Sequence, residues 1–180
     1  MPIYKLYHKD VLIGNIEADE DTAYKIHHID GLRLDRPSAE SERIIVYTDG
    51  AYKPSTDQGG WAYVVTGKYE TEEYGGKENT TNNQMELLAV IKALYYFSKQ
   101  NNASERTIII VTDSQYVYGC AVKGWKRNKN TKYWTIYEEL LKKLKLQLTN
   151  VEFQWTKGHD GNPGNERADT LAVRGSNLLL

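Results

Sequence analysis

TIIIVTDS, residues 107–114, is the stretch that decides the fold. Its first six residues are all β-branched, which favours a strand, and they show no alternation of polar and apolar side chains. A uniform apolar strand of this kind is typical of the centre of a parallel sheet that is buried on both faces. Helical patterns flank it at 82–99 and 114–122, so the stretch predicts an α/β domain.

Outward from this strand, the patterns predict a mixed sheet of five strands. Three strands before it are expected to form an antiparallel meander, and one more strand follows it between two helices. The expected strands are 43–48, 60–66, 68–75 and 151–155, and the later helices are 132–148 and 163–174. Short right-handed connections then give three antiparallel strands followed by parallel ones, with helices on the faces of the sheet.

A polar stretch divides the chain near its start. Residues 35–42, DRPSAESE, contain a proline and almost no apolar side chain, which is typical of a linker. Before it, strand patterns at 3–7 and 11–16 predict a β-hairpin, and 19–29 predicts a short helix. We therefore expect a small module at 1–34, a linker at 35–42 and the main domain at 43–180.

The composition is that of a folded globular protein, with 180 residues of which 40% are hydrophobic and 26% charged. No apolar run approaches the ~20 residues of a membrane span, and no cleavable signal peptide is visible, so we expect no membrane association. The single cysteine, Cys120, excludes an internal disulfide and a cysteine-based zinc site. A reducing compartment, the cytoplasm, is the predicted location.

The net charge of −1 is unevenly distributed along the chain. Residues 1–42 hold 5 Lys/Arg against 9 Asp/Glu, whereas the remainder holds 18 against 15. Five cations lie within ten residues around Trp125: Lys123, Lys126, Arg127, Lys129 and Lys132. This mixture suits a nucleic-acid backbone and its sugars, and a solvated helix end is the alternative.

Four carboxylates are candidates for a functional site, three of them where functional groups collect in open α/β sheets, at strand ends and helix starts. Asp49 is expected to end the strand at 43–48, Asp113 ends the strand at 107–112, and Glu86 lies in the first turn of its helix. Asp169 lies inside the last helix, where uncompensated burial of its charge would cost several kcal/mol.

Taken singly, these residues have structural explanations. Asp49 with the glycine after it reads as a turn, Asp113 as a helix cap, and Asn83 with Glu86 as a capping box. Together, four carboxylates at one edge of a sheet would repel each other unless divalent cations neutralised them. Because all the ligands are oxygens, Mg²⁺ or Mn²⁺ is predicted rather than zinc.

The main domain resembles a type 1 ribonuclease H of the bacterial kind. The motifs that carry the resemblance are YTDGA (47–51), GGWA (59–62), TTNNQMEL (80–87), TDSQYV (112–117), GWK (124–126), GH (158–159) and GNERAD (164–169). The resemblance implies endonucleolytic hydrolysis of the RNA strand of an RNA/DNA hybrid, which leaves 5′-phosphate and 3′-hydroxyl ends. The catalytic, metal-binding residues would be Asp49, Glu86, Asp113 and Asp169.

The resemblance also implies a mechanism with two Mg²⁺ ions, for which Mn²⁺ is a possible substitute. Asp49 would bridge the ions, Asp169 would bind the one that activates water, and Glu86 with Asp113 the one beside the leaving group. His159 would assist proton transfer or product departure, although a lone loop histidine is often inert.

Substrate contacts are implied in the same way. Gly50 (through its backbone), Asn82, Asn83 and Gln115 would contact 2′-hydroxyls or bases in the minor groove, unless the asparagines only cap a helix. Trp125 would pack on a deoxyribose, with core burial as its alternative. The residues expected to contact the phosphate backbone of the hybrid are Thr81, Lys126 and Arg127.

Two departures from the family pattern stand out. The basic excursion after GWK is short, and residues 1–42 do not resemble the hybrid-binding module that precedes many such domains. We expect a monomer, with residues 1–34 as a candidate site for a protein partner. The alternatives are a ribonuclease H domain of a reverse transcriptase, disfavoured by the small module, a transposase or integrase core, and an inactive hybrid-binding protein.

Overall fold

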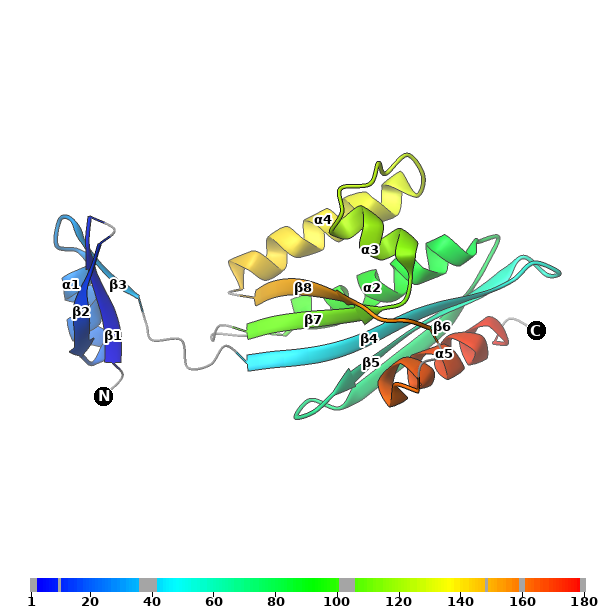
Figure 1. Ribbon diagram of the computed structural model, residues 1–180, viewed down its shortest axis with the longest axis horizontal. Helices are drawn as coiled ribbons and strands as arrows, with labels where there is room; N and C mark the ends of the chain where they lie inside the picture. The colour runs from blue at the N-terminus through cyan, green and yellow to red at the C-terminus, as the bar shows by residue number, and fades with distance from the viewer. Residues whose placement is uncertain are drawn as a thin grey trace. The chain divides into compact units, whose positions relative to one another are not determined.

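The chain folds as two units. A computed structural model describes residues 3–9, 11–35, 42–100, 106–147, 149–158 and 161–178 (Figure 1). Contacts between residues divide the chain into Met1–Glu40 and Ser41–Leu180, and the polar stretch between them lies mostly outside the described residues. None of the helices in the described ranges is both long and apolar enough to cross a bilayer.

The larger unit is built on a five-stranded sheet in the order β6-β5-β4-β7-β8. Strands β4, β5 and β6 pair antiparallel, whereas β4, β7 and β8 pair in parallel, as predicted for a mixed sheet. Their bounds are β4 (Glu42–Lys53), β5 (Gln58–Thr66), β6 (Thr71–Glu78), β7 (Arg106–Thr112) and β8 (Thr149–Trp155). Every residue of β7 is buried, which explains the apolar run Ile108–Val111 at its centre.

Helices cover both faces of this sheet (Figure 1). One face carries α2 (Asn82–Ser98), α3 (Gln115–Ala121) and α4 (Thr131–Leu146), and the main hydrophobic core lies between them and the strands. The other face carries α5 (Pro163–Ser176) over a smaller cluster that includes Ala62, Ala168 and Leu171.

Helix α5 packs so closely on the sheet that its backbone contacts the backbones of β5 and β6. A Cβ atom at Gly60 of β5 would overlap the carbonyl oxygen of Ala172 in α5, so only glycine fits there. Gly175 meets the backbone of Gly75 in β6 in the same way. This close approach fixes the position of α5, the helix that carries Asp169.

The smaller unit contains a strand that the sequence did not predict. It consists of β1 (Ile3–His8), β2 (Val11–Glu17), α1 (Glu20–His27) and β3 (Leu32–Asp35), with strand order β2-β1-β3. Strand β3 has only four residues and begins directly after a turn at Gly31, whose φ is 77°. So short a strand has too little alternation to be recognised, and its pairing with β1 makes it stable.

Candidate active site

Three carboxylates converge at one edge of the larger sheet. Ligand oxygens of Asp49, Glu86 and Asp113 all lie within 4.8 Å of one another. Asp49 and Asp113 meet because β4 and β7 run in parallel register as far as Tyr47 opposite Val111, two residues before each of them. The meeting of these two aspartates across neighbouring strands therefore follows from the sheet topology, as the sequence predicted.

Asp49 does not end its strand, which corrects one expectation. Strand β4 continues to Lys53 because β5 pairs with it along this whole length, up to Lys53 opposite Gln58. The parallel neighbour β7 ends earlier, at Thr112. Asp49 thus lies just beyond the end of β7, at a point where β4 is still paired with β5, so an intact strand holds its backbone.

Helix α2 brings Glu86 to this point. The helix begins at Asn82 and its cap is Thr81, whose hydroxyl accepts a hydrogen bond from Gln84 N at 3.3 Å. Glu86 is therefore the fifth residue of the helix and lies beyond the first turn, so the alternative explanation of Asn83 and Glu86 as a capping box does not hold. Thr81, two residues before Asn83, has the β-region backbone that a cap requires, and it is the residue that caps the helix.

Burial raises the proton affinity of two of these carboxylates. Asp49 and Glu86 are each only 6% exposed. Burial, followed by the charges of Asp113 and Asp169, raises the pKa of Asp49 to about 8, although the Gly50 N–H at 2.8 Å acts in the opposite direction. Burial and then the charges of Asp49 and Asp113 raise the pKa of Glu86 well above its ordinary value. Without a compensating cation, the cluster therefore retains protons.

The donor set fits a hard divalent cation. Glu86 Oε1 accepts a weak hydrogen bond from Asn82 Nδ2 at 3.4 Å, whereas Oε2 is buried with no partner in the described part of the chain. A buried carboxylate oxygen without a donor is costly. Carboxylate oxygens are the ligands that Mg²⁺ and Mn²⁺ prefer, so these residues suit such an ion.

Helix α5 adds two polar groups beside the cluster. Asp169 is half-buried and lies outside the group of three, but it acts on Asp49 through its charge and a side-chain hydrogen bond. Asn165, one turn earlier, is 3% exposed and its Nδ2 donates to Asp113 Oδ2 at 3.4 Å. The sequence analysis did not select Asn165, although a polar residue four positions before Asp169 shares its helix face.

Comparison with known proteins shows which family the larger unit matches. A family model described as "RNase H" matches residues 41–177. Ribonuclease H of Cupriavidus pinatubonensis is 40% identical over an alignment 148 residues long, which covers 74% of this chain and 95% of that protein. Ribonuclease HI of Pseudomonas aeruginosa strain PAO1 is 38% identical over an alignment 150 residues long, which covers 76% of this chain and 95% of that protein. The chain belongs to the ribonuclease H family.

Membership of the ribonuclease H family, in its bacterial type 1 form, was the prediction from the motifs, and it is confirmed. Ribonuclease H activity follows from it, and with it the class of the enzyme, a nuclease and hydrolase. The match begins at residue 41, so it does not extend over β1, β2, α1 and β3.

The amides expected to contact substrate in this ribonuclease H domain are not helix caps. Asn83 is exposed in the first turn of α2, and Gln115 is the exposed first residue of α3. Thr81 caps α2 and Ser114 caps α3, the latter by accepting a hydrogen bond from Val117 N at 3.3 Å. The cap explanation therefore does not hold for Asn82 or Asn83, because Thr81 is the cap of α2.

Trp125 does not belong to the core, which removes the alternative of core burial. Its side chain is 50% exposed. One part of the ring rests on Gly119 of α3, where a Cβ atom would overlap it, and the backbone N–H of Trp125 donates to the Gly119 carbonyl oxygen at 3.1 Å. The indole is thus held in place with much of its surface open to a ligand.

The two basic residues after Trp125 differ. Lys126 is exposed. Arg127 donates from Nε and Nη2 to the Cys120 carbonyl oxygen at 3.2 and 3.1 Å, pairs with Glu138, and stacks over Trp134 at 4.1 Å. Contact between the Arg127 guanidinium and a phosphate, as the sequence analysis expected, would compete with all these interactions.

His159 lies outside the described residues, so its place relative to the carboxylates stays a prediction. The residue before it, Gly158, is described and lies beside the cluster. A Cβ atom at Gly158 would stand 2.9 Å from Asp113 Oδ2. The segment that leads into His159 therefore passes next to Asp113.

Proposed function

We propose that this chain is a metal-dependent endonuclease that hydrolyses the RNA strand of RNA/DNA hybrids and leaves 5′-phosphate and 3′-hydroxyl ends. The observation that carries the proposal is the buried convergence of Asp49, Glu86 and Asp113 in a ribonuclease H fold. Burial of carboxylates at this cost has no structural benefit of its own, whereas it prepares a site for cations.

The residues that hold the metal are Asp49, Glu86, Asp113 and Asp169, with two Mg²⁺ ions, or Mn²⁺ in their place. When bound, such ions activate water and neutralise the charge that develops on the phosphate and the leaving oxygen. Asn165 orients the Asp113 carboxylate through its amide. The strand β4 and helix α2 hold Asp49 and Glu86 in a buried setting, where the electrostatic interactions of these carboxylates are strong.

Recognition of the hybrid is proposed to divide between its strands. The backbone of Gly50 and the amides of Asn82, Asn83 and Gln115 contact 2′-hydroxyls or bases of the RNA side. On the DNA side, Trp125 packs on a deoxyribose, Thr81 contacts a phosphate, and Lys126 supplies charge, with Arg127 contributing only if its internal bonds open. His159 is assigned to proton transfer or product departure.

The first unit is proposed to contact a protein partner rather than nucleic acid. Residues 1–42 carry more acidic than basic side chains, which opposes direct binding of phosphates. We retain the predictions of a monomeric, cytoplasmic protein, the latter because the one cysteine, Cys120, is a buried free thiol.

The test is cleavage of an end-labelled RNA/DNA hybrid by the full chain in the presence of Mg²⁺, with duplex RNA and duplex DNA as controls. We expect cleavage of the RNA strand of the hybrid alone, and loss of cleavage with a chelator or in Asp49→Asn, which removes a charge at constant volume. Glu139→Gln, at an exposed glutamate of α4, is the matched control and should cleave normally. Binding of the hybrid without cleavage by the wild type would favour the inactive alternative.

A further inference from the structure

Strand β2 is an edge of the small sheet, and its sequence does little to prevent pairing with another chain. In the order β2-β1-β3, one side of β2 pairs with β1, and no other described strand pairs with its second side. Every second residue of an edge strand directs its N–H and C=O groups away from the sheet, where they can pair with an added strand. Of the residues VLIGNIE, only Glu17 is charged, and none is lysine or proline.

The other edges of the two sheets are protected in the usual way. Strand β6 carries four charged residues in its eight, and β8 presents the exposed polar side chains of Asn150, Glu152 and Gln154 at alternate positions. Charged and polar side chains of this kind hinder the addition of a strand. Strand β3, the second edge of the small sheet, has only four residues. Among these edges, β2 therefore offers the best template for an added strand.

The side chains of β2 add an apolar surface to this edge. Val11 is 64% exposed and Ile13 is 55% exposed. The register with β1 skips Ile13, between Leu12 and Gly14, so this residue has no counterpart in β1. A Cβ atom at Gly14 would meet no described atom outside its chain neighbours within 4 Å, which leaves room for another backbone to approach.

Charge distinguishes the two ends of this edge. Glu17 ends β2, and Asp19 and Asp21 follow at the start of α1; all three are exposed. The other end, next to Val11, carries the exposed Lys9 in the turn of the hairpin. A chain that pairs here meets negative charge at one end and an apolar surface with a cation at the other, so complementary charge would set its direction.

We infer that the edge of β2 binds an extended segment of a partner protein as an added antiparallel strand. Basic residues at the start of the segment lie beside Glu17, and the alternating apolar residues that follow pack on Val11 and Ile13. The antiparallel direction is favoured because such ladders are slightly more stable per residue than parallel ones. The inference rests on the proposed role of the first unit as the site of a protein partner, and it names the form of that partner.

The probe is a fluorescent peptide in which a pair of lysines precedes alternating valine and threonine, titrated into the full chain. One control peptide has glutamates in place of the lysines, and another has the lysines at its other end. A third has proline at its central valine, which removes a backbone donor. We expect the probe to bind about tenfold tighter than each control, and its affinity to fall with added salt.

Variants of β2 test where the peptide binds. Ile13→Gln removes apolar surface and should weaken binding of the probe by about tenfold. Ile29→Gln is the matched control, because Ile29 is 52% exposed in the same unit but follows α1. Glu17→Gln should weaken binding and reduce its salt dependence, whereas Asp30→Asn, at an exposed position after α1, should not. All four variants should cleave the hybrid as the wild type does.

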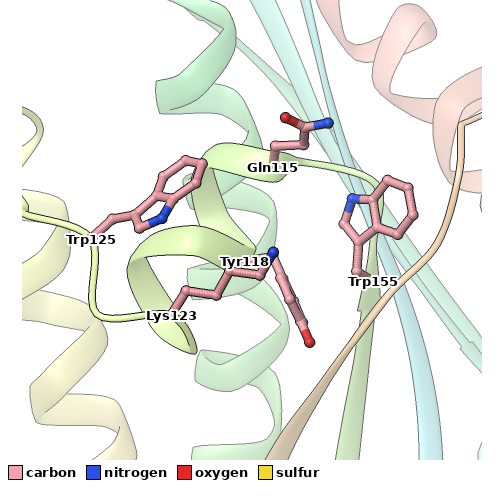
Figure 2. A pocket seen from close by; sticks show the side chains of 5 residues that line it. All are labelled: Gln115, Tyr118, Lys123, Trp125 and Trp155. Carbon is pink, nitrogen blue, oxygen red and sulfur yellow. The ribbon is translucent and has the colours of Figure 1, made fainter.

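Hydrogen exchange followed by mass spectrometry gives a second readout. The peptide should slow exchange of the backbone amides of residues 11–17 and leave β6 and β8 unchanged. Protected amides in β1 show that the small unit of each variant is folded. An RNA/DNA hybrid added to the full-length Asp49→Asn variant should instead protect the pocket that Gln115 and Trp125 line (Figure 2).

The outcomes separate this inference from the proposed function. Failure of the probe to bind, equal binding of any control peptide, or undiminished binding to Ile13→Gln would overturn the inference. A dimer in sedimentation that Ile13→Gln dissociates would also overturn it, because a second copy would then cover the edge. Protection of residues 11–17 by the hybrid would overturn the proposed role of the first unit, and failure of the wild type to cleave the hybrid would overturn the proposed activity.

Discussion

The backbone of Gly50 in β4 lies directly against the backbone of Glu86 in α2. A Cβ atom at residue 50 would overlap Glu86 N and approach the Met85 carbonyl carbon. Asp49 precedes this glycine, so the strand and the helix that carry two of the clustered carboxylates meet without a side chain between them. The distance between Asp49 and Glu86 therefore depends on the absence of a single methyl group.

Gly50→Ala should separate β4 from the start of α2. We expect a loss of stability of about 1 to 3 kcal/mol, as for other overpacked sites, together with a large loss of hybrid cleavage. Urea unfolding measures the first and a cleavage assay the second. Gly14→Ala is the control, because no described atom outside its chain neighbours lies within 4 Å of a Cβ there, and it should change neither. An alanine at residue 50 that leaves cleavage intact would contradict this account of the site.

The metal-free protein should lose stability as the pH rises. The pKa of Asp49 is raised from 3.8 to about 8, so between these values the folded protein holds a proton that the unfolded chain has released. The free energy of unfolding then falls with increasing pH across this window, and Glu86 acts in the same direction. Urea unfolding in a chelator at several pH values between about 4 and 8 measures the slope.

Asp49→Asn provides the comparison for this slope. The amide cannot ionise, and its neutrality also relieves Glu86, so the variant should show a shallower fall and exceed the wild type in stability near pH 8. Glu139→Gln, at an exposed position, should retain the slope of the wild type. Identical slopes in Asp49→Asn and the wild type would show that the cluster does not hold protons.

Lys126 and Lys129 are exposed, and we expect both to contact phosphates. Lys126→Gln and Lys129→Gln should weaken hybrid binding with little effect on the chemical step. Each lost contact should reduce the slope of log K against log salt by about 0.7 to 0.9. Lys142→Gln and Lys145→Gln, on exposed positions of α4, are the controls. An unchanged slope for the first pair would mean that these lysines are only solvated.

Arg127 should behave differently from those lysines. Arg127→Gln removes two hydrogen bonds to the Cys120 carbonyl oxygen, the pair with Glu138 and the stacking on Trp134. We expect the free energy of unfolding to fall by on the order of 1 to 3 kcal/mol, seen as a lower urea midpoint. The slope of log K for the hybrid against log salt should not change. A change in the slope alone would restore the original expectation of a phosphate contact.

Gln115→Ala and Asn83→Ala should each impair hybrid cleavage by about threefold to tenfold, the value of one hydrogen bond. Their amides are exposed at the start of α3 and α2, close to Asp113 and Glu86. A 2′-deoxy substitution next to the scissile phosphate should penalise the wild type more than these variants. Asn150→Ala, at an exposed amide on β8, is the control. Equal penalties in all proteins would exclude a role in reading the hydroxyl.

The strands and helices that carry the site were predictable from the sequence because their patterns are local. The buried run of β7, the helical spacing of α2 and the proline at the start of α5 each identify an element without knowledge of its neighbours. What could not be predicted depends on pairing across the chain. The extension of β4 to Lys53 follows from its partner β5, and β3 exists only because β1 lies beside it.

The residues of the site also fall into those that the sequence predicted and those that it did not. Asp49, Asp113 and Glu86 could be placed at one edge of the sheet from topology alone. The engagement of Arg127 by Cys120 and Glu138 could not, because a basic run looks the same whether its members face solvent or the protein. The amide of Asn165 beside Asp113 was also missed, since Asp113, which follows β7, is 52 residues earlier in the chain.

The strand order of the small unit has a consequence for trimming the chain. Its first strand, β1, is the middle one, and both β2 and β3 form their ladders with it. Deleting residues 3–8 would leave the other two strands with no common partner, so a shortened chain would lose the unit as a whole rather than one edge of it. During synthesis, the hairpin of β1 and β2 can form as soon as Glu17 is available, whereas the sheet closes only when Asp35 has emerged.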